Sequence, residues 1–127
     1  MARWHGTSKR KPSGGRKVHA RKKRSTEIST EKQHAYVGTR KQKVYRRTGG
    51  NALTRVLADE FVNVSDASKG TTSKASIKTV TENASNPNFV RRNILVRGAV
   101  VETDLGMVRI TSRPGKDGVI NGTLIDS

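Results

Sequence analysis

Several residue types are missing or scarce in this chain of 127 residues. It contains no cysteine, which excludes disulfides, thiolate catalysis and zinc sites with cysteine ligands. No apolar run approaches the ~20 residues that a membrane helix needs, and no apolar stretch follows the basic N-terminus to form a secretory signal. We therefore expect an intracellular protein with no membrane partner.

The most informative absence is that of acidic residues, because none precedes Glu27. Residues 1–24 contain ten Lys or Arg and almost nothing apolar. Such a segment cannot form a core and repels itself, so it should be disordered unless a polyanion such as nucleic acid neutralises it. An organelle transit peptide is also basic and poor in acids, but it needs an amphipathic apolar face that this segment lacks.

Charge is divided unevenly along the chain. The formal net charge is +16 and the sequence pI is about 11.2, above the value of roughly 9 that marks nucleic-acid-binding domains. Residues 1–50 hold 16 Lys or Arg against two acidic residues, whereas residues 51–127 hold ten against eight. The sequence therefore predicts a basic, extended RNA-binding arm at residues 1–35 and a separate, more ordinary domain at residues 36–127.

The pattern of the second region indicates β structure. Short runs of β-branched and apolar residues alternate with turn signals, most clearly in ILVRGAVVETDLGMVRITS, where Asp104-Leu105-Gly106 forms a turn between two strands. Residues 36–50 contain strand-forming residues among basic ones, residues 83–93 suggest a loop with one helical turn, and SRPGKDG suggests a hairpin turn. We expect an all-β fold, a small barrel or sandwich behind an extended arm.

Aromatic residues are few, and three of the five lie among the basic residues. These are Trp4, Tyr36 and Tyr45. An unpaired base stacked on such a ring gains roughly 1–3 kcal/mol. The two tyrosines could instead pack on the β domain, but Trp4 has no core around it, which favours a contact with RNA. The glycine pairs Gly14–Gly15 and Gly49–Gly50 match no Walker motif; they predict turns, with backbone contact to phosphate as the alternative.

Catalytic and metal-binding patterns are weak. His5, His19 and His34 lie 14 and 15 residues apart, too far for a local metal site, so we expect no metal and no cofactor. Glu102 and Asp104 could hold Mg²⁺ for a nuclease, although solvated turn residues are the simpler interpretation. With no catalytic triad indicated and no small-molecule substrate implied, the sequence predicts a protein that is not an enzyme.

Three long motifs carry a family resemblance. They are MARWHGTSKRKPSGGR, TRKQKVYRRTGGNAL and NILVRGAVVETDLGMVRITSRPGKDGVINGTLI. Together they resemble the eighth e-type protein family of the archaeal and eukaryotic small ribosomal subunit, over essentially the whole chain and in the compact archaeal form. The resemblance implies a structural ribosomal protein in the cytoplasm, bound to small-subunit ribosomal RNA and to neighbouring ribosomal proteins.

The resemblance also implies which side chains contact RNA. They are the basic and aromatic residues of the arm, of the second motif and of the last loop: Arg3, Trp4, His5, Lys9, Arg10, Lys11, Arg16, Lys17, His19, Arg21, Lys22, Lys23, Arg24, Arg40, Lys41, Lys43, Arg46, Arg47 and Arg113. A ribosome-assembly factor of the same family is the nearest alternative function. A DNA-compacting protein and an RNA-processing nuclease that uses Glu102 and Asp104 are the more distant ones.

Overall fold

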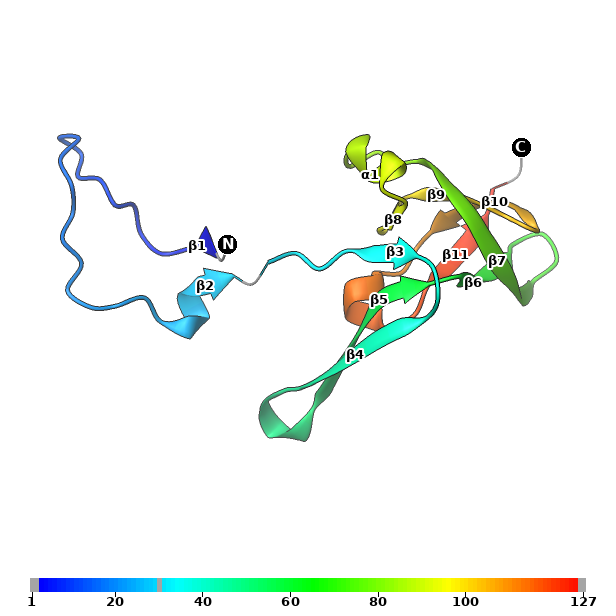
Figure 1. The fold of residues 1–127 in the computed structure, drawn as a ribbon, viewed down its shortest axis with the longest axis horizontal. Coiled ribbons are helices and arrows are strands. Elements are labelled where there is room, and N and C mark those ends of the chain that lie inside the picture. The colour runs from blue at the N-terminus through cyan, green and yellow to red at the C-terminus, as the bar shows by residue number, and fades with distance from the viewer. Residues whose placement is uncertain (1–2, 30, 126–127) are drawn as a thin grey trace. The chain divides into compact units, whose positions relative to one another are not determined.

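The computed structural model describes residues 3–29 and 31–125. The chain forms two compact units, Met1–Lys32, here the arm unit, and Gln33–Ser127, here the barrel unit (Figure 1). The expected class, a mainly β fold with a small barrel, is confirmed. The division into an arm and a β domain at residue 35 stays a prediction about domain organisation.

The arm unit is a long loop whose two ends are tied together. Strand β1 (Arg3–Trp4) pairs antiparallel with β2 (Ile28–Ser29), and a single 3₁₀ turn, η1 (Ser25–Glu27), precedes β2. Further along, an isolated bridge joins Arg10 to Arg16 around a turn at Gly14, whose φ of 84° suits glycine. Figure 1 shows this loop in blue. Serine and threonine disfavour a longer helix near residue 25, since their side chains compete for backbone groups.

The barrel unit is built on a closed five-stranded barrel. Its strand order is β10–β11–β6–β7–β9, with β11 and β6 parallel and the other neighbours antiparallel. The bounds are β6 (Phe61–Asp66), β7 (Thr71–Glu82), β9 (Val100–Thr103), β10 (Gly106–Ile110) and β11 (Asn121–Leu124). The predicted turn at residues 104–106 joins β9 to β10, and Gly106 there has a φ of 124°.

The barrel interior follows directly from the alternation of side chains along each strand. Inward positions of β6, β9 and β10 are fully buried and β-branched, whereas the residues between them are more exposed. Gly122 of β11 faces inward as well, and a Cβ there would clash with the Val108 side chain, so the barrel closes tightly at this point. The largest fully buried side chains of the unit are Ile94, Leu95, Ile110, Val56, Val62, Val64, Val101 and Val108.

A second sheet in the same unit has the strand order β4–β5–β3–β8. The bounds are β3 (Ala35–Val37), β4 (Lys41–Arg46), β5 (Ala52–Asp59) and β8 (Ile94–Leu95), with the 3₁₀ turn η2 (Thr48–Gly50) at the tip of the β4–β5 hairpin. In Figure 1 this hairpin extends away from the barrel strands. It therefore presents its basic side chains on a projecting element of the barrel unit.

Two short helices complete the barrel unit. Helix α1 (Asn88–Arg91) confirms the helical turn expected within residues 83–93. The segment SRPGKDG connects the antiparallel neighbours β10 and β11, as expected of a hairpin turn, but Pro114–Asp117 within it forms the one-turn helix α2, which was not expected. Proline suits the first position of a helix. Gly118, with a φ of 74°, ends the helix, and its backbone lies close to the Thr54 side chain. Within the described ranges 3–29 and 31–125, no helix is long and apolar enough to cross a membrane.

Candidate nucleic-acid interface

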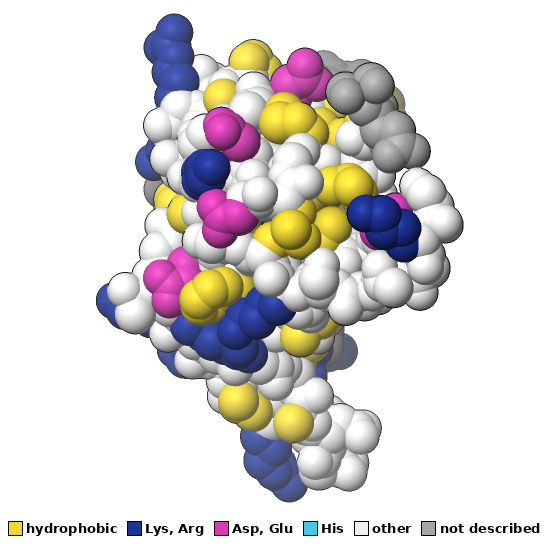
Figure 2. Space-filling view, turned by 90° about the vertical axis from the view of Figure 1, so that its right-hand side faces the viewer, with side chains coloured by type: hydrophobic (Ala, Val, Ile, Leu, Met, Phe, Trp, Pro, Cys, Tyr) yellow, Lys and Arg dark blue, Asp and Glu magenta, His cyan; other side chains and the backbone are white. Residues whose placement is uncertain are grey.

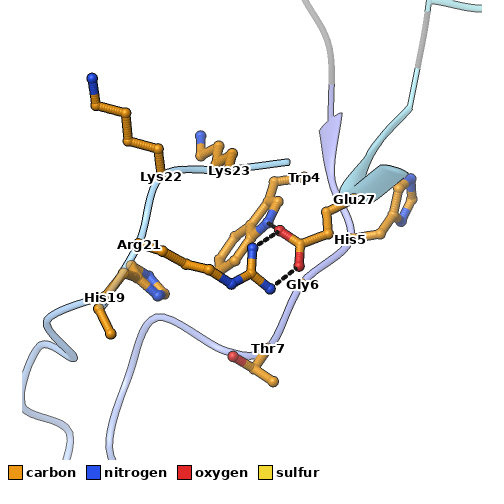
Figure 3. Close-up of a pocket in the computed structure, with 10 residues that line it drawn as sticks. Trp4, His5, Gly6, Thr7, His19, Arg21, Lys22, Lys23 and Glu27 are labelled. Carbon is orange, nitrogen blue, oxygen red and sulfur yellow. Dashed lines mark hydrogen bonds and ion pairs between the residues drawn. The ribbon is translucent and has the colours of Figure 1, made fainter. Parts of the chain in front are cut away.

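The centre of the arm unit is the carboxylate of Glu27. Its Oε2 accepts a hydrogen bond from the indole Nε1 of Trp4 at 3.5 Å and one from the backbone N–H of Arg24 at 3.3 Å. The Arg21 guanidinium donates to both carboxylate oxygens, at 2.6 and 3.2 Å. In Figure 3 the carboxylate faces both the indole and the guanidinium, and dashed lines mark its bonds to them. One acidic side chain thus joins three parts of a basic segment.

The same contacts keep Glu27 ionised. The hydrogen bond from Arg21, together with the one from the Arg24 backbone, lowers the pKa of Glu27 to about 2. The pairing raises the pKa of Arg21 above its ordinary value for the same reason. At neutral pH both partners are therefore charged, and the Arg21 charge is matched within the arm unit.

The Trp4 ring borders a cavity of about 920 Å³. His19 meets the ring edge to face, with centroids 4.8 Å apart and planes at 88°. The ammonium groups of Lys9 and Lys23 lie 5.8 and 5.9 Å from the ring centroid, within range of a cation–π contact. The structure thus brings together several residues that the sequence implicated separately, and the lining is Trp4, His5, Gly6, Thr7, His19, Ala20, Arg21, Lys22, Lys23 and Glu27.

The remaining basic residues of the arm unit do not gather at this cavity. All are exposed. Arg10 donates through Nη1 to the Gly14 carbonyl, which supports the turn opposite the strand pair. The others are spread along the unit: Arg3, Lys11, Arg16, Lys17, Arg24 and Lys32. Such a dispersed set of charges suits contacts with several phosphates rather than one.

A second basic surface lies on the β4–β5 hairpin. Lys43 is paired in register with Arg55, and both cations lie about the Tyr45 ring, at 5.2 and 5.3 Å from its centroid. The Tyr45 hydroxyl donates to Gln33 Oε1 at 3.1 Å. Tyr45 therefore packs among cations and not in the apolar core, and Tyr36 is 40% exposed on β3. Lys41, Arg46 and Arg47 are exposed on the same hairpin.

Two predicted contact residues have roles within the fold. The Arg40 Nε lies 3.8 Å from Asp59 Oδ2. Asp59 is buried, and its Oδ1 also accepts a hydrogen bond from the Phe61 backbone N–H. Arg113 is exposed at the start of α2, where its backbone N–H donates to Asp117. Both guanidinium groups remain at the surface.

The acidic residues considered for metal chemistry do not form a site. Asp104 lies 3.6 Å from the Lys78 ammonium group, and Glu102 lies on β9 opposite Met107. Among the described residues, no three His, Asp or Glu side chains form a group that could hold a metal ion. Figure 2 shows a face of the barrel unit on which apolar, acidic and basic side chains are mixed.

Two of these features escape a reading of the sequence alone. The contacts of Glu27 are one of them. Its position as the first acidic residue after the basic run is the only hint in the sequence that it pairs with a basic side chain of the arm. Arg55 carries no such signal, because it lies in β5 outside the basic motifs and reaches Tyr45 only through strand pairing.

Together, the closed barrel and the strongly basic loop define a class of small β protein with surfaces suited to a polyanion. Comparison with known proteins identifies the family. The profile of "Ribosomal protein S8e" matches residues 4–125, so the chain belongs to the ribosomal protein S8e family. This confirms the resemblance carried by the three motifs.

Archaeal relatives match the chain over nearly its full length. The small ribosomal subunit protein eS8 of Methanospirillum hungatei is 49% identical over 123 residues, covering 97% of this chain and 98% of the relative. The protein of the same name from Methanocorpusculum labreanum is 48% identical with the same coverage. That of Methanosphaerula palustris is 46% identical.

Proposed function

We propose that this chain is a structural constituent of the small ribosomal subunit that binds and stabilises ribosomal RNA. Family membership is the observation that carries this proposal, since relatives of matching length bear the name of a small-subunit protein. The partners are ribosomal RNA and neighbouring ribosomal proteins, the location is the ribosome in the cytoplasm, and the protein is not an enzyme.

The arm unit supplies most of the electrostatic attraction. Each phosphate contact releases counterions, so dispersed Lys and Arg side chains give strong but largely sequence-independent binding. Of the arm unit's described residues, only Trp4, Glu27, Ile28 and Ser29 are even partly buried. With so little apolar contact the loop owes its free-state order to a few polar bonds, and docking on RNA completes its ordering.

The barrel unit acts as an anchor with a defined shape. Its closed barrel is held by apolar side chains and needs no partner to exclude water from its core. The β4–β5 hairpin adds a second group of cations around Tyr45. The barrel unit therefore holds the basic side chains of the β4–β5 hairpin in a defined position for contact with the RNA.

Sedimentation tests this function. We expect the tagged full-length chain to remain with mature small subunits in sucrose gradients at moderate salt. Release from mature subunits, with retention on precursor particles, would identify an assembly factor instead. Displacement from ribosomal RNA by an equal amount of duplex DNA would favour a general DNA-compacting protein, and Mg²⁺-dependent cleavage of labelled RNA that Glu102→Ala abolishes would favour a nuclease.

A further inference from the structure

The Trp4 cavity has the size of a ligand site. Small-molecule sites in proteins have volumes of roughly 300–1,000 Å³, and this half-open cavity of the arm unit has a volume of about 920 Å³. Trp4 is the only tryptophan of the chain and lies in a segment without an apolar core. Burial alone does not explain why a large aromatic ring stands at this position.

The ring is held in one orientation from several sides. Its Nε1 donates a hydrogen bond to Glu27, the His19 imidazole is perpendicular to it with ring centroids 4.8 Å apart, and Gly6 lies directly against it. A Cβ at position 6 would overlap the indole ring atoms. Glycine at position 6 therefore allows the backbone to approach the ring, so that the indole is positioned before any partner arrives.

The charges around the ring favour an anion. Lys9 and Lys23 lie within 6 Å of its centroid, and in Figure 3 Lys22 extends away from the Glu27 carboxylate. Glu27 is the one acid of the lining, and Arg21 already neutralises it. A ligand that offers both a flat aromatic face and a negative charge fits this combination of groups.

We propose that this pocket binds one unpaired nucleotide of the RNA, with the base stacked on the Trp4 indole and the phosphate held by the lysines beside it. The inference rests on the proposed function and deepens it. Bases inside a duplex have no free face, whereas an unpaired base can stack on an aromatic side chain. The arm unit thereby distinguishes single-stranded from paired RNA, which phosphate contacts alone do not.

Because Trp4 is the only tryptophan, its fluorescence reports on this pocket alone. The full-length chain is titrated with a short single-stranded RNA, with a blunt-ended RNA duplex of equal length and with inorganic polyphosphate, while binding is followed separately by competition with a labelled RNA. We expect all three to bind, and only the single strand to quench the Trp4 emission strongly. Equal quenching by the duplex or polyphosphate, or no quenching by a bound single strand, would overturn the proposal.

A pair of glycine variants tests the geometry. Gly6→Ala forces the indole out of position, whereas Gly15→Ala places a Cβ no nearer than 3.8 Å to the closest side-chain atom and serves as the matched control. We expect Gly6→Ala to lower the affinity for single-stranded RNA by roughly 5- to 150-fold, which corresponds to the loss of one stacked base. The salt dependence of that affinity should be unchanged. Wild-type affinity in Gly6→Ala would contradict the assigned geometry, and the ligand comparison on the unaltered chain stands whether or not the variant folds.

Two further measurements separate the possible failures. A nucleoside monophosphate should quench much more weakly than the single-stranded RNA, since it lacks the other phosphates; tighter binding of the monophosphate would indicate a small-molecule site instead. Co-sedimentation with mature subunits is measured on the same protein. Co-sedimentation without quenching refutes the nucleotide pocket alone, whereas loss of co-sedimentation refutes the proposed function.

Discussion

The arm unit and the barrel unit are held together by different forces. The barrel unit has a continuous core of buried Val, Ile, Leu and Ala side chains, so its stability depends on apolar area and packing. The arm unit has one carboxylate that joins an indole, a guanidinium and a backbone amide. The stability of the barrel unit should therefore depend on cavity-forming substitutions and on denaturant. The structure of the arm unit should depend on salt, pH and polyanions. Each of the following experiments separates these two responses.

Removal of residues 1–24 should have the largest effect on RNA binding. The deletion eliminates ten Lys or Arg, and each lost phosphate contact lowers the slope of log affinity against log salt by about 0.7–0.9. We expect affinity for ribosomal RNA to fall by orders of magnitude at low salt, measured by filter binding across a salt series. Barrel-unit melting, measured by circular dichroism, should be unchanged. An unaltered slope would show that the arm unit does not supply the phosphate contacts.

Ile110→Ala should have the converse effect: it should destabilise the barrel unit and leave the salt dependence of RNA binding unchanged. Ile110 of β10 is 1% exposed inside the barrel, and truncation of such a side chain costs about 2–5 kcal/mol in the free energy of unfolding. Denaturant unfolding checks this value, with Val44→Ala, at a side chain that is 64% exposed, as the control. Below its melting temperature, Ile110→Ala should keep the wild-type salt slope for RNA. A changed slope would mean that the two units do not act separately.

The strands of the barrel could be predicted because their physics is local. β-branched alternation along residues 94–112 identified two strands, and Gly106 between them supplied the turn with positive φ. The helix at Pro114–Asp117 was missed because proline and glycine also favour turns, and only the buried Pro114 and the Gly118 contact with Thr54 favour a helical turn here. The closure of β11 beside β6 is a long-range parallel pairing, which no local pattern encodes.

The candidate site was predictable in composition but not in arrangement. The charge of the arm and the isolation of Trp4 were visible as residue identities. Trp4 and Glu27 are 23 positions apart in the sequence. Their hydrogen bond depends on the pairing of β1 with β2, and each of these strands has only two residues. Likewise, Arg55 joins Tyr45 through strand register and not through sequence proximity.

Lys43→Ala tests whether the barrel unit also contacts phosphate. Lys43 is exposed beside Tyr45 on the β4–β5 hairpin, so its loss should lower the salt slope by about 0.7–0.9 if it makes one contact. Lys78→Ala is the matched control, because it removes the same charge from a side chain that faces Asp104 at 3.6 Å. The control should keep the wild-type slope. Equal slopes for both variants would show that Lys43 makes no phosphate contact.

Acidification should disturb the arm unit at a pH set by Glu27. Its folded-state pKa of about 2 is below the ordinary value of 4.5, so the contribution of the carboxylate to arm structure is complete above pH 4.5 and is lost as pH falls through about 2. Trp4 emission should therefore be constant from pH 7 to 5 and change between pH 4.5 and 2. The measurement uses a background with both His5→Gln and His19→Gln, which removes the two imidazoles that line the Trp4 cavity.

Glu27→Gln in the same background provides the comparison. The amide cannot ionise, so the emission should already differ at pH 7 from that of the background with Glu27 intact, and it should show no transition between pH 4.5 and 2. A transition centred near pH 4.5 in the background with Glu27 intact would mean that Arg21 does not hold the carboxylate in solution. Since the barrel unit has no tryptophan, protonation of its own carboxylates does not enter this emission directly, and the measurement assigns the pH response to the arm unit.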